Sequence, residues 1–281
     1  MSQRLAECFQ NARREKRTLF CPFLTAGYPR MEFLPRMLLA LQESGAGCVE
    51  MGFPFSDPIA DGPVIQESYR VALERGATVE KIIGAVRHAR ESGLRIPLLA
   101  MASFSILFRY GTEDFAEACA YAGVDGLILP DLPLEEAPPV VRTIGIRGLA
   151  ASLLIAPGTD PARRARIAEL CTGFVYYLSV SGITGERSAL PPDIVSNLAQ
   201  LRKLTDRPVC VGFGISQPRQ VRSLRGLADG VIVGSAIIRR LTEESACPEP
   251  DYAQAVREFS SALAVELRKN EPGNGQSQYT R

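Results

Sequence analysis

Short runs of apolar residues recur along the chain, and their starts lie about 30 residues apart on average. Each run is almost continuously hydrophobic, which is typical of parallel strands that are covered on both faces. We therefore predict eight parallel β-strands. They are Leu19–Thr25, Gly47–Gly52, Ile96–Met101, Gly126–Pro130, Leu149–Ile155, Phe174–Ser179, Val209–Phe213 and Gly230–Gly234.

Segments in which apolar residues recur with the helical period separate these runs. Several of them open on a capping residue or a proline, and we expect Thr112, Asp160 and Ser216 to lie at such helix starts. The clearest predicted helices are Met31–Glu43, Val79–Glu91, Glu113–Tyr121, Pro161–Cys171 and Ile194–Leu204.

Strand and helix alternate about eight times in 281 residues, which favours the α/β class and a closed (β/α)8 TIM barrel. A doubly wound open sheet is the alternative, but no G-x-G-x-x-G motif follows the first strand. We expect one barrel domain over residues 1–269, with an extra N-terminal helix at Ser2–Lys16 and an extra helical segment after strand 2. The polar residues 270–281 are expected to form a disordered tail.

The charge balance removes several classes of protein. Lys and Arg number 32 against 31 Asp and Glu, and no long basic run indicates nucleic-acid binding. No apolar run reaches the roughly 18 residues of a membrane span, and the charged N-terminal segment is unlike a secretory signal. The seven cysteines are an odd number without a C-x-x-C pair, so a reduced, cytoplasmic protein is the simplest interpretation.

The single histidine limits the chemistry further. His88 stands in a charged stretch of a predicted helix, which is typical of a solvated helix face. Because Ser-His-Asp sites, Cys-His sites and His-rich metal centres all need imidazole, they are disfavoured, and no metal site is expected. Acid–base chemistry then falls to carboxylates, Tyr, Lys or Cys.

Carboxylates follow the second predicted strand, at the end of the barrel where such folds carry their active sites. Cys48 and Glu50 share one face of this strand, and we expect Glu50 to point into the barrel mouth. Burial raises the pKa of an unpaired carboxyl, which suits a general acid–base catalyst near neutral pH. A paired glutamate that closes a barrel layer is the structural alternative. Asp57 and Asp61 follow in a proline-rich loop, where each is also compatible with a simple turn.

Glycines follow the last three predicted strands, in Ser181–Gly185, Gly212–Ser216 and Gly234–Ala236. Glycines let backbone N–H groups converge on an anion, and a helix N-terminus adds the positive end of its dipole. A tight turn explains any one of these loops, but the loops after strands 7 and 8 are the usual phosphate site of a TIM barrel. Three such loops in succession predict phosphate binding.

Together these motifs resemble the alpha subunit of tryptophan synthase over roughly residues 15–265. The most specific is the long loop after the second strand, Glu50–Gln66, which reads EMGFPFSDPIADGPVIQ. The others are Leu24–Pro29, Pro130–Pro133, Tyr176–Ser179, Gly182–Gly185, Gly212–Ser216 and Gly230–Ala236.

The resemblance implies a lyase of tryptophan biosynthesis. It implies retro-aldol cleavage of indole-3-glycerol phosphate to indole and glyceraldehyde 3-phosphate without a cofactor in this chain. It also implies a beta subunit that carries pyridoxal phosphate, receives the indole and forms an α2β2 tetramer with this chain. By the same resemblance Glu50 transfers the protons, and Asp61 accepts the indole N–H.

The resemblance further implies which residues contact the substrate and the partner. The substrate contacts are Phe23, Ile65, Tyr176, Thr184, Gly185, Phe213, Gly214, Gly234 and Ser235, of which the glycines and the serine hold the phosphate. Thr184 is implied to lie in a lid that closes over the substrate and orders Asp61. Asp57, Asp131 and Pro133 correspond to positions that face the beta subunit or the lid.

One stretch departs from the family pattern. After the third strand the family usually carries Tyr and Asn in a Met-x-Tyr-x-Asn-like pattern, whereas this chain has Ser103 and Ser105 after Met101. The smaller serines change one wall of the expected indole pocket and part of the expected contact with the beta subunit.

Two other functions are compatible with the sequence. The barrel could bind the phosphorylated ligand and activate a partner without doing chemistry itself. It could also be a phosphosugar isomerase, although that function leaves the pairing of Glu50 with Asp61 unexplained. An assay of indole formation with and without a beta subunit separates the three.

Overall fold

The computed structural model describes residues 2–59, 61–179, 191–212, 214–215 and 217–268. These residues form one sheet in which every strand pair is parallel, in the order β5-β4-β3-β2-β1-β9-β8-β7-β6. The strands are β1 (Leu19–Thr25), β2 (Val49–Gly52), β3 (Leu98–Met101), β4 (Gly126–Ile128), β5 (Ala150–Ser152), β6 (Leu154–Ile155), β7 (Val175–Leu178), β8 (Val209–Gly212) and β9 (Gly230–Val233).

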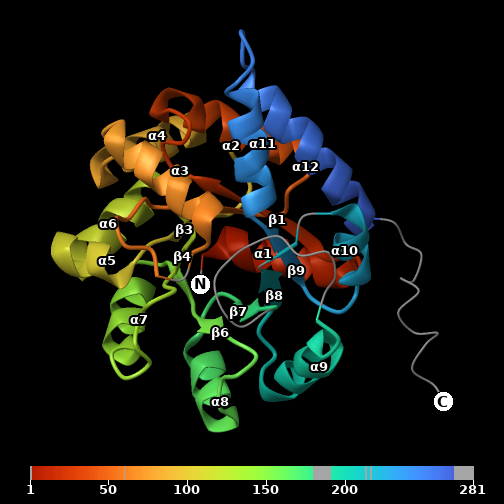
Figure 1. The fold of residues 1–281 in the computed structure, drawn as a ribbon. Coiled ribbons are helices and arrows are strands. Elements are labelled where there is room, and N and C mark those ends of the chain that lie inside the picture. The colour runs from red at the N-terminus through yellow and green to blue at the C-terminus, as the bar shows by residue number, and fades with distance from the viewer. Residues whose placement is uncertain (1, 60, 180–190, 213, 216, 269–281) are drawn as a thin grey trace.

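The sheet curls into a TIM barrel because its first strand, β1, pairs with its last, β9 (Figure 1). The predicted fold class is thereby confirmed, and the open doubly wound sheet was the wrong alternative. The predicted strand Leu149–Ile155 is divided into β5 and β6. At the division the Leu153 N–H donates to the Cys171 Sγ instead of to a neighbouring strand.

Helices surround the strands on the outside of the barrel (Figure 1). Both helices of the extra segment after β2, α3 and α4, are present, and α4 begins and ends where the sequence predicts. The helices are α1 (Gln3–Arg14), η1 (Met31–Phe33), α2 (Leu34–Ser44), α3 (Pro63–Glu74), α4 (Val79–Glu91), α5 (Phe104–Tyr110), α6 (Thr112–Ala122), α7 (Ala137–Ile146), α8 (Pro161–Leu170), α9 (Ile194–Leu204), α10 (Pro218–Ser223), α11 (Ser235–Glu244) and α12 (Tyr252–Arg268).

The predicted helix starts have mixed outcomes. Asp160 caps α8, since its carboxylate accepts the N–H groups of Ala162 and Arg163. Thr112 also lies at a helix start, but its expected role as the capping residue was wrong, because it is the first residue of α6 and Gly111 occupies the cap position. Ser216 lies outside the described residues.

The predicted N-terminal helix closes the barrel at the end where the strands begin. Leu5, Phe9 and Ala12 form the buried face of α1, and the Phe9 ring packs against the Phe174 ring with centroids 5.9 Å apart. In Figure 1, α1 lies behind the strands and inside the ring of helices. The opposite end of the barrel, where the strands end, is left for the site.

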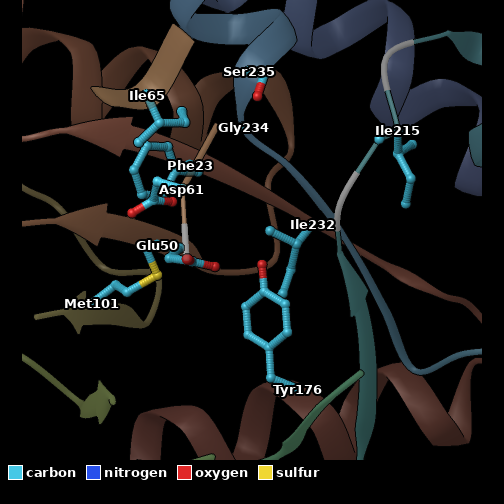
Figure 2. Close-up of a pocket in the computed structure, with 11 residues that line it drawn as sticks. Phe23, Glu50, Asp61, Ile65, Met101, Tyr176, Ile215, Ile232, Gly234 and Ser235 are labelled. Carbon is cyan, nitrogen blue, oxygen red and sulfur yellow. The ribbon is translucent and has the colours of Figure 1, made fainter. Parts of the chain in front are cut away.

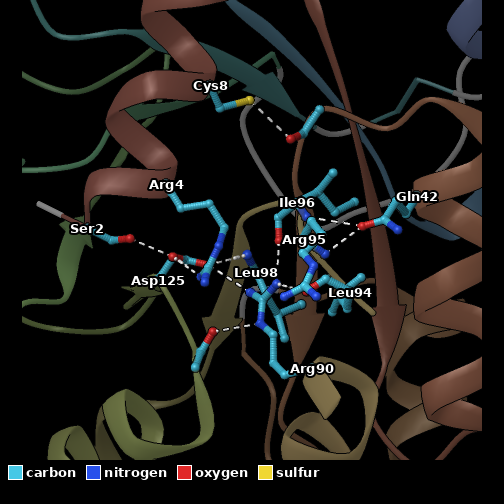
Figure 3. A network of polar contacts seen from close by, with 12 residues as sticks. Ser2, Arg4, Cys8, Gln42, Arg90, Leu94, Arg95, Ile96, Leu98 and Asp125 are labelled. Atoms are coloured by element: carbon cyan, nitrogen blue, oxygen red, sulfur yellow. Dashed lines mark hydrogen bonds and ion pairs between the residues drawn. The ribbon is translucent and has the colours of Figure 1, made fainter. Parts of the chain in front are cut away.

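A buried aspartate fastens the start of α1 to the barrel (Figure 3). Asp125, directly before β4, accepts hydrogen bonds from the Ser2 hydroxyl and the Arg4 guanidinium. It also accepts from Arg90 of α4 and from the backbone N–H of Leu98 in β3. Four donors from three elements therefore meet on one carboxylate.

The same arrangement recurs at the other end of α1. Asp229, directly before β9, accepts from Arg13 of α1 at 3.2 Å and from the backbone N–H of Val209 in β8 at 2.7 Å. Arg202 of α9 forms an ion pair of 2.6 Å with it. Each aspartate thus joins α1, an outer helix and the start of the preceding strand.

The other surface predictions concern His88, the cysteines and the C-terminal tail. His88 lies exposed on α4, as the charged stretch around it indicates. All seven cysteines are free thiols. In the part of the chain that the structure describes, every helix is too short or too polar to cross a membrane. The predicted tail, residues 270–281, lies outside the described residues and stays a prediction.

Candidate active site

The register of the first three strands places Glu50 in the barrel interior. Glu50 of β2 is paired with Phe23 of β1 on one side and with Leu99 of β3 on the other. Its side chain is 3% exposed, and its Oε2 atom has no hydrogen-bond partner among the described residues. The alternative of a paired glutamate that closes a barrel layer is therefore not supported.

A cavity opens at the ends of the strands, and residues of five strands and of helices α3 and α11 line it. Figure 2 shows Glu50 and Asp61 next to each other in it, with Tyr176 across the cavity and Ser235 near its upper end. Its lining brings together eight of the residues that the sequence predicts: Phe23, Glu50, Asp61, Ile65, Tyr176, Gly214, Gly234 and Ser235. Thr184, Gly185 and Phe213 lie outside the described residues.

Asp61 is held at the cavity by its backbone, just before α3 begins. Its N–H donates to the Pro58 carbonyl at 3.2 Å, and its carbonyl accepts from the Gln66 side-chain amide at 2.8 Å. The side chain is 6% exposed. Because these bonds engage only the backbone, the carboxylate is available to a ligand.

Burial raises the pKa of both carboxyls, because a low-dielectric cavity disfavours the charged form. It raises the pKa of Glu50 to about 8, with a further contribution from the charge of Asp61. It raises the pKa of Asp61 to about 7, with a further contribution from Asp131. Glu50 thus keeps its proton to a higher pH than Asp61 does. Both carboxyls titrate near neutral pH, where a general acid–base catalyst works best.

The other end of the cavity is suited to an anion. Ser235 begins α11, whose first N–H groups have no acceptor within the helix and carry the positive end of its dipole. Gly214 adopts a left-handed backbone with φ of +77°, which favours glycine. Gly234 lies against Phe23, since a Cβ atom at position 234 would be in van der Waals contact with the Phe23 Cβ at 3.4 Å.

A second cavity, of about 330 Å³, adjoins the first, and Asp61 and Met101 line both. Ser103 and Asp131 stand on its wall, and the Ser103 hydroxyl donates to the Asp131 carboxylate at 2.5 Å. The backbone N–H of Phe104 donates to the same carboxylate at 2.7 Å. Ser103, which departs from the family pattern, is therefore hydrogen-bonded to Asp131.

The predicted partner-facing residues lie at the outer rim of this end of the barrel. Asp57 and Pro133 are exposed, whereas Asp131 is half-buried. The Ser56 hydroxyl donates to the Asp57 carboxylate at 2.6 Å. Their contact with a partner remains a prediction.

Sequence reasoning missed three residues that line the first cavity and, among others, Tyr69 of the second. Met101, Ile215 and Ile232 line the first cavity, and Tyr69 lines the second. Met101 stands at the end of β3 beside Gly52 of β2, so strand register carried a signal for it. Tyr69 follows Ile65 by one helical turn, which places both on the same face of α3.

The fold and the site define a (β/α)8 barrel whose cavity holds two buried carboxylates at one end and the start of a helix at the other. Residues 9–267 match the family described as "Tryptophan synthase alpha chain". The chain belongs to the tryptophan synthase alpha chain family.

Similar proteins cover nearly the whole chain. The tryptophan synthase alpha chain of Gloeobacter violaceus is 42% identical over 261 residues, which is 92% of this chain and 93% of the relative. The alpha chain of Prochlorococcus marinus is 46% identical over 234 residues, 83% of this chain and 85% of the relative. The structure of the subunit alpha from Legionella pneumophila superposes with a TM-score of 0.87 at 32% identity, covering 95% of this chain and 98% of that one.

Proposed function

We propose that this chain cleaves indole-3-glycerol phosphate to indole and glyceraldehyde 3-phosphate in tryptophan biosynthesis. The observation that carries the proposal is one cavity that holds Glu50 and Asp61 at one end and the start of α11 at the other. The substrate has matching ends: an indole ring whose carbon–carbon bond must break, and a phosphate. The reaction is a retro-aldol cleavage, which needs proton transfers and no redox step.

Glu50 supplies the first proton. With a pKa of about 8 it is protonated at neutral pH, and its Oε2 has no partner among the described residues, so it is free to donate to the indole C3. Protonation at C3 converts the indole into a leaving group. The Glu50 carboxylate then takes the proton from the glycerol hydroxyl as that carbon becomes the aldehyde and the bond electrons return to the ring. The two transfers leave Glu50 protonated again.

Asp61 stabilises the charge that develops in between. Protonation at C3 places positive charge on the indole nitrogen, and an ionised carboxylate that accepts the N–H stabilises it most when that charge is largest. Burial raises the pKa of Asp61 to about 7, and Asp61 is therefore about half ionised at neutral pH. We assign the N–H acceptor role to Asp61.

Apolar side chains bind the indole ring, and backbone groups bind the phosphate. Phe23, Ile65 and Tyr176 surround the carboxylates, and we assign them to the indole and glycerol pocket. Gly214, Gly234 and Ser235 form the opposite end, where the first N–H groups of α11 favour an anion. Thr184, Gly185 and Phe213 remain proposed substrate contacts.

The family implies a beta subunit as the partner. We propose an α2β2 tetramer in which indole passes to the beta subunit, whose pyridoxal phosphate serves the next reaction, while this chain uses no cofactor. Asp57 and Pro133 at the rim are the proposed contacts, and Asp131 lies just behind them. Two exposed apolar side chains near the same end, Ile59 and Phe108, support such a surface. Seven free cysteines agree with a cytoplasmic location.

The test is indole formation from indole-3-glycerol phosphate by the purified chain, alone and with a cognate beta subunit. We expect indole in both assays and more of it with the partner. Tight binding of the substrate without indole in either assay would instead support a non-catalytic regulatory subunit. Isomerisation of a phosphosugar without indole would support the third function.

A further inference from the structure

Tyr69 of α3 is buried at the site without a role in the reaction described above. Its side chain is 3% exposed, and its ring end lies against the end of β2. A Cβ atom at Gly52 would be 2.4 Å from the Tyr69 Oη and 2.6 Å from the Phe23 Cζ. Only glycine at position 52 leaves room for the phenol, which therefore lies two residues beyond Glu50 along β2.

The phenol of Tyr69 and the Asp61 carboxylate line the same second cavity. The hydrogen bonds that hold Asp61 in place run through its backbone N–H and its backbone carbonyl. A phenol donates a hydrogen bond and an ionised carboxylate accepts one, and such a bond is stronger in a low-dielectric cavity than in water. The two side chains are therefore complementary within the cavity that they share.

The other donors near Asp61 are already engaged. The Ser103 hydroxyl donates to Asp131, and the Gln66 amide donates to the Asp61 carbonyl. Tyr176 stands across the first cavity on β7 and has interactions of its own. Among the described residues that line either cavity there is no Lys, Arg or His.

Among the described residues, the charged groups that line a cavity with Asp61 are all acidic. They are Glu50 on β2, Asp131 after β4 and Asp57 in the loop that also carries Asp61. Burial, together with Asp61 and Glu50, raises the pKa of Tyr69 well above its usual range. Tyr69 therefore keeps its proton at every pH at which the carboxylates titrate.

We propose that Tyr69 is a positioning residue for Asp61: with substrate in the cavity, its phenol donates to one Asp61 oxygen while the other accepts the indole N–H. This inference rests on the proposed function. A donor to the ionised carboxylate favours that form and fixes its orientation. Tyr69 then keeps Asp61 ionised, as a hydrogen-bond acceptor, beside other described charged residues that are all carboxylates.

The test compares Tyr69→Phe, which removes only the hydroxyl, with the wild type and with Tyr177→Phe. Tyr177 is a buried tyrosine that follows Tyr176 on β7 and lines neither cavity. The Tyr177→Phe variant therefore controls for the loss of a buried hydroxyl. The readout is kcat and KM for indole formation from pH 6 to about 9 with the beta subunit present, together with the thermal midpoint.

Loss of the donor should raise the pKa of Asp61 in the substrate complex by about one unit. We expect Tyr69→Phe to lower kcat about fivefold at pH 7, to change KM less than about twofold, and to approach the wild-type kcat by about pH 9. Tyr177→Phe should match the wild type at every pH. An unchanged Tyr69→Phe profile, or a loss that is equal at every pH, would overturn the inference.

A double-mutant cycle with Asp61→Asn adds a second criterion. If Tyr69 acts through Asp61, Tyr69→Phe should change the remaining rate less than about twofold in the Asp61→Asn background. An undiminished effect there contradicts the inference while leaving the proposed function intact. A wild-type chain that forms no indole overturns both.

Discussion

Ser103 donates a hydrogen bond of 2.5 Å to Asp131, and the charge of Asp131 contributes to the raised pKa of Asp61 on the same cavity. The stretch that departs from the family pattern is therefore connected to one of the two proposed catalytic carboxylates. Ser103 holds Asp131 in place together with the Phe104 N–H, and Asp131 faces Asp61. The departure affects the surroundings of Asp131, and through its charge the pKa of Asp61, while both Glu50 and Asp61 remain in the cavity.

Asp131→Asn should move the pH dependence of the reaction. Removing the negative neighbour lowers the pKa of Asp61 from about 7, so Asp61 stays ionised to lower pH. We expect the acidic limb of kcat/KM to shift downward by several tenths of a pH unit. The measurement is the pH profile of indole formation, with Ser105→Ala, at an exposed position of α5, as the control. An upward shift would contradict the arrangement.

Glu50→Gln should abolish most turnover while keeping the fold. Glutamine has the size of glutamate but cannot donate or accept a proton at these steps, and a general acid–base catalyst contributes about 10²–10⁴-fold. We expect kcat for indole formation to fall by about that factor with an unchanged circular dichroism spectrum. A fully active variant would rule out the proposed role of Glu50.

The same variant should remove a contribution to the pH dependence of stability. The folded-state pKa of Glu50, about 8, lies above its usual value of 4.5, so the folded chain binds more protons between these values. The free energy of unfolding therefore decreases as pH rises through this window. Urea titrations at pH 5 and 8 should show wild type losing stability relative to Glu50→Gln, on the order of 2–3 kcal/mol. A constant difference between the two proteins would count against the raised pKa.

Ser235→Ala should weaken substrate binding and spare the chemistry. Ser235 stands at the proposed phosphate end of the cavity, away from the reacting bond, and a hydrogen bond to a charged group contributes about 1.5–3 kcal/mol. Because the phosphate keeps this contact throughout the reaction, KM should rise about tenfold with kcat nearly unchanged. Weaker competition by glycerol phosphate is the supporting measurement. A fall in kcat at constant KM would place Ser235 elsewhere in the mechanism.

Asp125→Ala should destabilise the fold much more than Arg4→Ala. The Asp125 side chain is 1% exposed and Arg90 11%, so the aspartate variant leaves a buried cation unpaired, at a cost of about 3–5 kcal/mol. Arg4 is 41% exposed, and its loss should cost about 1 kcal/mol. Chemical denaturation measures both, and Arg70→Ala, which removes exposed ion pairs on α3, is the control. Equal losses in the first two variants would contradict this ordering.

Much of the site could be predicted from the sequence because the features that place its residues act over a few neighbouring positions. Alternation along β2 places Glu50 on the inward face, and parallel strands bring the loops after them to one end of the barrel. The glycine before α11 and the carboxylates before α3 therefore meet without any knowledge of the side-chain packing. Seven of the eight predicted strands occur as single strands, and the eighth is only divided at Leu153.

The contacts between distant segments could not be predicted in this way. The phenol of Tyr69 reaches β2 only because Gly52 leaves room for it, and Ser103 meets Asp131 only because β3 and β4 end side by side. Asp125 and Asp229 contact α1 only because that helix lies across the end of the barrel where the strands begin.

The sequence by itself determined the barrel, the inward carboxylate and the glycines of the proposed phosphate site, since strand period and backbone freedom act over a few residues. The tertiary structure decided which donors reach each carboxylate and how far each pKa moves. Those properties depend on burial and on the register between segments that lie far apart in the chain.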